Sequence, residues 1–102
     1  MTTATLRADV AIIGGAIIGS ATAYFLKQLA PSLSVTVIEY DPTYEWCSTL
    51  RASGGARRLF SCPENIEMSK FSIDFIKAFP QAMAANGREA PVDWVEGGYL
   101  FI

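Results

Sequence analysis

The sequence predicts an α/β fold built on a parallel strand–helix–strand unit. Three observations predict it: a β-branched run at residues 8–13 that ends in two glycines, a helical pattern at 16–29, and a second β-branched run at 34–39. Two strands joined by a helix within so short a span almost always lie parallel, with a right-handed crossover.

Each element of this unit has its own signal. The first run is apolar and β-branched, which is typical of a strand buried on both faces. The helix is indicated by apolar residues at helical spacing, and Pro31 blocks its continuation. These apolar residues are Ile18, Ala21, Phe25 and Leu29.

A polar segment with no sustained period occupies residues 40–62 and predicts a long loop. Loops of this length in compact domains are often functional. A second helix is predicted over 63–79, because Pro63 suits a first helical turn and Met68, Phe71 and Phe75 form an apolar stripe. Pro80 should kink or end it, with a short helical piece running on to Asn86 before Gly87.

The last residues predict a β-hairpin. Residues 92–95 and 99–102 are apolar and aromatic, and they flank Glu96-Gly97-Gly98. The second of these runs continues to the last residue without a turn or polar tail.

Composition excludes several functions. The 102 residues are 51% hydrophobic with a net charge of −2, which excludes disorder and disfavours a nucleic-acid-binding module. No histidine is present, so imidazole catalysis and His-containing zinc sites are excluded. The spacing of Cys47 and Cys62 is not that of metal ligands, so we expect no bound metal. We expect both cysteines to be reduced thiols.

The uncharged stretch at residues 10–26 has some features of a secretory signal, with Arg7 ahead of it and Ala21-Thr22-Ala23 near its end. Asp9 cancels the charge of Arg7, and Gly14-Gly15 interrupts the stretch. At 17 residues it is also at the lower limit for a membrane span. We therefore expect no membrane span and a cytoplasmic protein.

The turn after the first strand carries a dinucleotide-binding motif with one departure. It reads Gly14-Gly15-Ala16-Ile17-Ile18-Gly19 against G-x-G-x-x-G. The first glycine makes the turn, the second lets a pyrophosphate approach, and the third lets the helix pack on the strand. Ala16 places a methyl group at the second position. The N–H groups of the helix N-terminus still favour an anion.

Glu39 ends the second strand, 20 residues after Gly19. An acidic side chain there accepts hydrogen bonds from the adenosine ribose and would repel a 2′-phosphate. The alternative is a tight turn in an α/β core with Glu39 as a solvated strand end. The order of strand, glycine turn, helix, strand and acid favours a Rossmann-like nucleotide site.

Three segments together resemble the flavin-dependent D-amino-acid oxidase superfamily, which includes glycine oxidase, sarcosine oxidase and dimethylglycine dehydrogenase. ADVAIIGGAIIGSATAYFL is similar to the family's opening strand, turn and helix, VTVIEYD to its ribose-binding strand, and STLRASGGARRLFS to the following loop. The resemblance implies FAD as cofactor, and hydride transfer from a carbon–nitrogen bond of an amine or amino acid to the flavin.

The resulting prediction for the cofactor site combines the motif with this resemblance. The predicted FAD-binding residues are Gly14, Gly15, Ala16, Ile18, Gly19, Glu39, Tyr40, Ser48, Thr49, Ser53 and Gly54. No catalytic residue is assigned. For Arg51, Arg57 and Arg58 we favour a solvated or ion-paired surface role over a role beside the flavin or a substrate carboxylate.

The domain prediction places an incomplete Rossmann-like FAD-binding domain at residues 1–90 and the first hairpin of an α+β substrate domain at 91–102. The expected partners are an amine or amino-acid substrate and the rest of the oxidoreductase chain, with no nucleic acid. We expect no turnover from these residues alone. The alternatives are a nucleotide-binding module of the NAD or ADP-ribose type without redox chemistry, and a remnant in which Ala16 has ended cofactor binding.

Overall fold

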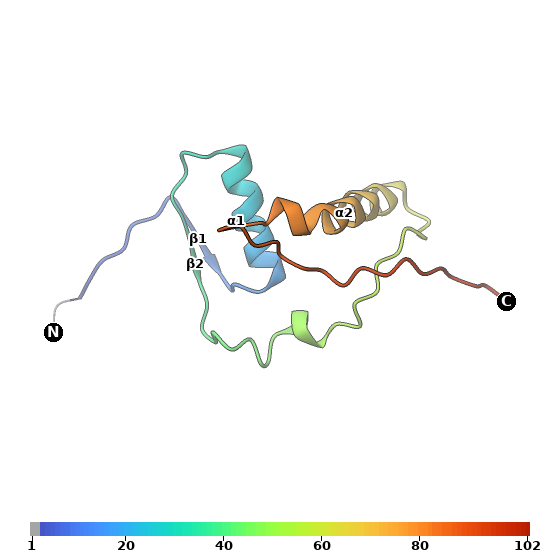
Figure 1. Cartoon of the computed structure of the whole chain (residues 1–102). Helices are drawn as coiled ribbons and strands as arrows, with labels where there is room; N and C mark the ends of the chain where they lie inside the picture. Colours follow the sequence, from blue (N-terminus) through green and yellow to red (C-terminus); the bar gives the residue numbers. More distant parts are fainter. Residues whose placement is uncertain (1–2) are drawn as a thin grey trace. The chain divides into compact units, whose positions relative to one another are not determined.

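The computed structural model describes residues 3–102. Its elements, in chain order, are β1 (Val10–Ile13), α1 (Ile17–Leu29), β2 (Val35–Ile38), a 3₁₀ turn η1 (Ser48–Arg51) and α2 (Pro63–Ala82) (Figure 1). The chain divides into two compact units, Met1–Ser53 and Gly54–Ile102, which are described separately below.

The first unit is the predicted βαβ unit. β1 and β2 pair in parallel, with Val10 opposite Val35 and Ile13 opposite Ile38. The carboxylate of Asp9 accepts a hydrogen bond from the backbone N–H of Ser34 at 2.8 Å, which fixes the register where the two strands begin. The α/β fold class and the parallel pairing are thus confirmed.

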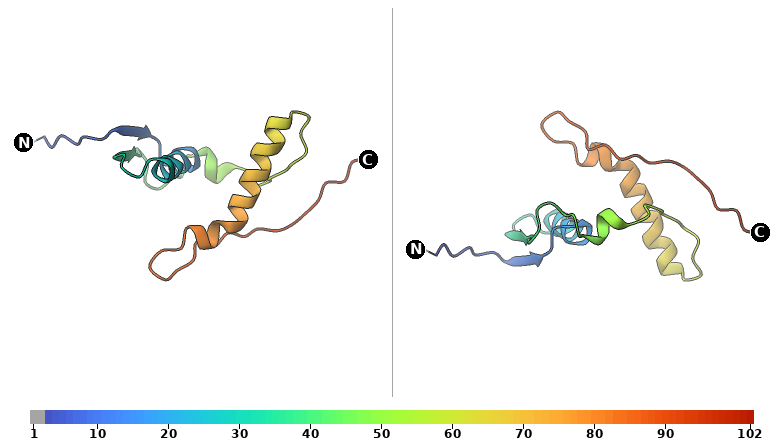
Figure 2. Two further views of the ribbon diagram at one scale, coloured as in Figure 1. Left: turned by 90° about the horizontal axis from the view of Figure 1, so that it is seen from above. Right: turned by 90° about the horizontal axis from the view of Figure 1, so that it is seen from below.

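Helix α1 lies beside the two strands (Figure 2). At its end, Lys27 Nζ donates to the backbone carbonyls of Pro31 and Leu33 and ties the helix to the loop that leads into β2. The expected burial of the first strand on both faces is wrong for the described residues. Ile12 is half-buried, but Ile13 is 79% exposed, because the described sheet has two strands and one helix beside it.

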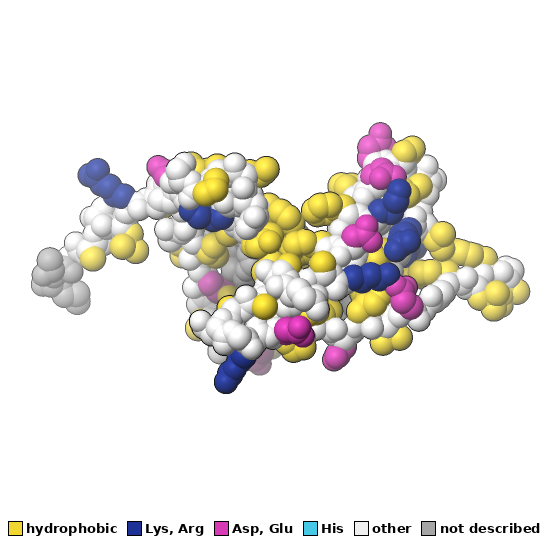
Figure 3. Space-filling model, turned by 45° about the horizontal axis from the view of Figure 1, so that its top comes forward, with side chains coloured by type: hydrophobic (Ala, Val, Ile, Leu, Met, Phe, Trp, Pro, Cys, Tyr) yellow, Lys and Arg dark blue, Asp and Glu magenta, His cyan; other side chains and the backbone are white. Residues whose placement is uncertain are grey.

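In the second unit, α2 continues past Phe79 to Ala82, with Pro80 inside its last turn. Proline removes one N–H donor, a loss that is smaller near a helix end than in the middle. The helix carries Ile73, which is 4% exposed and is the one buried residue among residues 3–102. In Figure 3, yellow hydrophobic side chains accordingly reach the visible surface in many places.

The helical piece expected up to Asn86 is wrong. Asn86 and Gly87 both have positive φ, 52° and 74°, and they connect a bridge in which Ala85 and Arg88 exchange backbone hydrogen bonds of 2.9 and 3.0 Å. Two successive residues with positive φ define the tight turn that Asn-Gly favours in hairpins.

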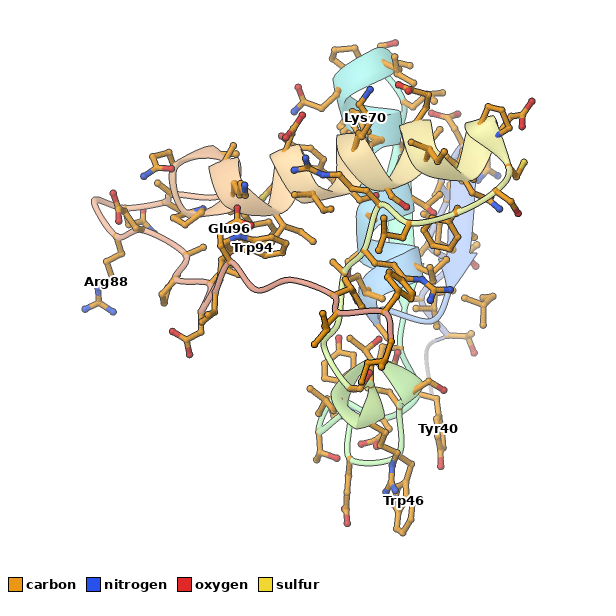
Figure 4. The ribbon with its side chains drawn as sticks, turned by 90° about the vertical axis from the view of Figure 1, so that its right-hand side faces the viewer. Tyr40, Trp46, Lys70, Arg88, Trp94 and Glu96 are labelled. Atoms are coloured by element: carbon orange, nitrogen blue, oxygen red, sulfur yellow. The ribbon has the colours of Figure 1, made fainter. Side chains whose placement is uncertain are left out.

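The hairpin expected at residues 92–102 is also wrong, since the structure has no strand there. Instead, Glu96 forms an ion pair with Lys77 of α2, and the Lys77 ammonium lies 5.6 Å from the ring centroid of Trp94 (Figure 4). An isolated two-stranded hairpin is marginally stable in water, and residues 54–102 contain no strand that it could join. The assignment of 91–102 to a substrate domain stays a prediction.

None of the helices in the described part of the chain is long and apolar enough to cross a membrane.

Candidate functional site at the glycine turn

The turn between β1 and α1 is held at both ends by hydrogen bonds. Gly14 has a φ of +100°, a conformation that glycine adopts without strain, and its N–H donates to the carbonyl of Ile38 at 2.8 Å. The hydroxyl of Ser20 donates to the carbonyl of Gly15 at 2.6 Å. The turn is therefore anchored to β2 on one side and to the first turn of α1 on the other.

Gly19 allows the helix to approach the turn closely. A Cβ built on Gly19 would lie 1.8 Å from the carbonyl oxygen of Gly14 and 3.2 Å from Cγ2 of Ile12. No side chain fits that space. The geometry agrees with the packing role of the third glycine of the motif.

Glu39 clamps the turn with both carboxylate oxygens. Oε2 accepts the N–H of Gly15 at 2.7 Å, and Oε1 accepts the N–H of Asp41 at 2.8 Å. The hydrogen bond from Asp41, followed by that from Gly15, holds the pKa of Glu39 below its ordinary value. The side chain is therefore a carboxylate at neutral pH, and each oxygen keeps a lone pair for a further donor.

The N-terminus of α1 presents free donors. Within residues 3–102, no group accepts a hydrogen bond from the backbone N–H of Ala16, Ile18 or Gly19. Three such N–H groups at the positive end of a helix attract an anion such as phosphate.

Thr49 completes this end of the helix. Ala16 occupies the N-cap position, where it has no side chain that can cap. Thr49 Oγ1, from η1, accepts the N–H of Ile17 at 3.3 Å instead. Its own hydroxyl proton stays available to a ligand at the helix N-terminus.

The structure thus brings part of the predicted site together. Gly14, Gly15, Ala16, Glu39 and Thr49 surround the N-terminus of α1. Gly19 lies in the first turn of the helix and packs on Gly14.

Ile18 joins this group through its free backbone N–H, whereas its side chain is 78% exposed. Other predicted residues do not join the group within their unit. Tyr40 is 95% exposed and extends away from the ribbon in Figure 4. Ser48 and Ser53 are also exposed. Gly54 begins the second unit, with a φ of +74°. Their contacts with FAD stay predictions.

Two of the arginines lie over exposed or half-buried aromatic rings. The guanidinium carbon of Arg51 lies 4.9 Å from the ring centroid of Trp46, and that of Arg57 lies 4.7 Å from that of Phe60. Arg51 also donates to the carbonyl of Glu45 at 3.3 Å. All three arginines, Arg51, Arg57 and Arg58, are exposed, and the choice between a surface role and a role beside the flavin stays a prediction.

Tyr44 is a residue of the site that sequence reasoning missed. A Cβ built on Gly15 would lie 3.0 Å from the phenol oxygen of Tyr44, so this hydroxyl lies directly beside the glycine turn. The backbone of Tyr44 has a φ of +57°. No pattern in the sequence marks a tyrosine for this conformation.

The described residues hold no group of three or more His, Cys, Asp or Glu that could bind a metal ion. Cys47 and Cys62 are free thiols. The chemistry of the site therefore comes from backbone N–H groups, hydroxyls and one clamped carboxylate.

A glycine turn, an open helix N-terminus and a carboxylate at the end of the next parallel strand define a dinucleotide-binding protein of the Rossmann-like class. The sequence model of the DAO family, described as FAD dependent oxidoreductase, matches residues 9–102. The chain belongs to this family, and the family's cofactor is FAD.

Relatives support the same assignment. The chain is similar to FAD-dependent oxidoreductase domain-containing protein 1 of Xenopus laevis, with 42% identity over 100 residues, covering 94% of this chain and 20% of the relative. It is 42% identical over 95 residues to the Drosophila melanogaster homolog, an alignment that covers 92% of this chain and 18% of the relative. It is 37% identical over 101 residues to the Bos taurus protein, which covers 94% of this chain and 21% of the relative. The chain thus spans about a fifth of the length of these curated relatives. No solved structure matches it significantly.

The residues present fit the adenosine and pyrophosphate part of FAD. Glu39 would accept the ribose hydroxyls, and the N–H groups of Ala16, Ile18 and Gly19, with Thr49, would hold the pyrophosphate. Three observations support this fit. The helix N-terminus has free N–H donors, the Glu39 oxygens keep lone pairs, and Gly19 lets α1 pack closely against the turn.

Proposed function

We propose that this chain supplies the adenosine and pyrophosphate end of the FAD site in an oxidoreductase that oxidises the C–N bond of an amine or amino acid. The observation that carries the cofactor part is the clamp of Glu39 across the glycine turn, next to three free N–H donors. The family membership and the resemblance of the loop after β2 support the class of reaction. The NAD or ADP-ribose module is not favoured, since the matching family is flavin-dependent.

In this proposal the residues bind and orient the cofactor. Glu39 stays ionised and fixes the ribose, while the N–H groups of the helix N-terminus and the Thr49 hydroxyl donate hydrogen bonds to the pyrophosphate. A bound flavin would supply the redox chemistry of C–N oxidation, with oxygen or an electron carrier as the final electron acceptor. None of residues 3–102 is assigned a proton-transfer role.

The test compares the complete protein with the 102-residue chain. We expect the purified complete protein to carry a visible flavin spectrum that bleaches when the right amine or amino acid is added without oxygen. The short chain should show no bleaching with any member of the same substrate panel. A flavin-loaded complete protein that is reduced by NADH or a hydroxy acid, but by no amine, would contradict the proposed substrate class.

A further inference from the structure

Tyr44 lies in the same small cluster as the ribose-binding carboxylate. The side of Gly15 that faces β2 is bordered by Tyr44 Oη, by Cβ of Glu39 and by Cγ1 of Val37, which lie 3.0, 3.4 and 3.4 Å from a Cβ built there. Gly15 itself donates to Glu39 at 2.7 Å. The phenol oxygen and the carboxylate thus border the same glycine.

The phenol has hydrogen-bonding capacity to spare. Half-buried tyrosine hydroxyls usually find a partner, yet Tyr44 Oη bonds to no group within residues 3–102. It is also not sealed away from solvent. A ligand hydroxyl can both donate and accept a hydrogen bond. Placed here, it could donate to the Glu39 carboxylate and accept from the Tyr44 hydroxyl.

The loop holds Tyr44 in place against a conformational cost. A φ of +57° lies in the left-handed region, which is unfavourable for a tyrosine. Backbone hydrogen bonds on both sides maintain it, from Tyr44 N–H to the carbonyl of Asp41 and from Cys47 N–H to that of Tyr44, each 3.1 Å.

Asp41 and Thr43 stiffen the approach to this residue. Asp41 Oδ1 accepts the N–H of Thr43 at 3.0 Å and its hydroxyl at 2.6 Å, and Thr43 Oγ1 accepts the N–H of Glu45 at 3.3 Å. The strained conformation is thus enforced by its surroundings, and its effect is to place the phenol beside Gly15.

We propose that Tyr44 is a second ribose-binding residue, whose hydroxyl donates a hydrogen bond to the ribose hydroxyl that itself donates to Glu39. This inference rests on the proposed function, because the ligand is the adenosine end of FAD. It assigns to Tyr44 a specific contact with the cofactor, in addition to any effect on the shape of the loop.

The experiment uses the complete protein stripped of flavin and measures the binding of ADP, 2′-deoxy-ADP and 3′-deoxy-ADP by calorimetry. Tyr44→Phe should weaken ADP binding about three- to tenfold, the effect of one neutral hydrogen bond. For one of the two deoxy analogues, wild type and variant should bind equally, since the hydroxyl that Tyr44 contacts is missing. Tyr99→Phe, a matched change in the second unit, should leave all three affinities unchanged.

The other outcomes are separable. Equal ADP affinity of Tyr44→Phe and wild type overturns the proposal. An equal loss for all three ligands assigns Tyr44 a structural role and also overturns it. A wild-type protein that binds neither FAD nor ADP refutes the proposed function itself, and the inference with it.

Discussion

Glycines in two regions of the chain differ in how much space surrounds their Cα atoms. In the turn at residues 14–19, a Cβ on Gly15 or Gly19 would meet neighbouring atoms at 3.0 Å or less. In the second unit, a Cβ on Gly54, Gly55, Gly97 or Gly98 would meet nothing within 4 Å. The contrast shows that the turn needs glycine for space, whereas the later glycine pairs have no such requirement in this structure. It can be tested by substitution in the complete protein.

Gly19→Ala should have the largest effect. Its methyl group would overlap the Gly14 carbonyl, so α1 must move away from the turn at a cost of about 3 kcal/mol or more. We expect loss of bound flavin and a large fall in the free energy of unfolding, measured by denaturant titration. A Gly19→Ala protein with normal stability and flavin content would show that the helix packs differently from this structure.

Glu39→Gln should come next. The amide can replace only one of the two acceptor oxygens and removes the charge, and a hydrogen bond to a charged group contributes about 1.5–3 kcal/mol. We therefore expect about a tenfold to hundredfold loss of FAD affinity, measured by flavin fluorescence. Glu45→Gln, a neutralisation on the same loop, is the matched control. If the Glu39 variant and wild type bound FAD with similar affinity, Glu39 would not be the ribose-binding residue.

The pH dependence follows from the same carboxylate. The pKa of Glu39 is lowered in the folded state. The stabilisation of the fold by its ionised carboxylate is therefore fully present above the ordinary pKa and is lost as the pH falls through the lowered pKa. The neighbouring Asp41 also has a lowered pKa, chiefly through the hydroxyl of Thr43. Between about pH 8 and about pH 5, we expect Glu39 to leave FAD affinity unchanged. A decline in that range that Glu39→Gln abolishes would show that the carboxylate is not held as described.

Ala16 and Thr49 should show a smaller, coupled effect. Thr49→Val removes the hydroxyl that accepts the Ile17 N–H and should weaken FAD binding about three- to tenfold. Ala16→Gly should strengthen binding and reduce the cost of Thr49→Val, because a pyrophosphate can then approach the backbone directly. A double-mutant cycle of dissociation constants measures this coupling. Thr36→Val on β2 is the control, and strictly additive effects would contradict the coupling.

Gly55→Ala should have the smallest effect. The added methyl group meets no atom within 4 Å and φ is not positive there, so the free energy of unfolding should change by no more than about 0.5 kcal/mol. Thermal unfolding beside Gly19→Ala measures the contrast. A strong destabilisation would show that this loop is packed in the complete protein.

Local patterns were enough to predict the first unit. The strand at residues 10–13, the helix that follows the glycine turn and the position of Glu39 are each encoded by residues close to them in the sequence. The clamp itself was not predictable in detail, since both oxygens of Glu39 bond to backbone N–H groups that no residue type marks.

The errors came from features that depend on context. Asn86-Gly87 is typical of a tight turn, but because it follows a helical pattern it equally fits the end of a helix, and only the bridge between Ala85 and Arg88 distinguishes the two. Residues 92–102 have strand-forming side chains, yet a strand needs a partner. Tyr44 could not be predicted, because its place beside Gly15 depends on a left-handed backbone conformation that its residue type disfavours.

The two-stranded sheet also bears on how the chain behaves in solution. Within the described residues, β1 pairs with β2 alone, so each strand has a free edge, and Ile13 and Ile38 at their carboxyl ends are 79% and 50% exposed. Unpaired apolar edges recruit strands from other molecules. The 102-residue chain expressed alone should therefore self-associate through these edges, whereas neighbouring strands of a longer chain would cover them.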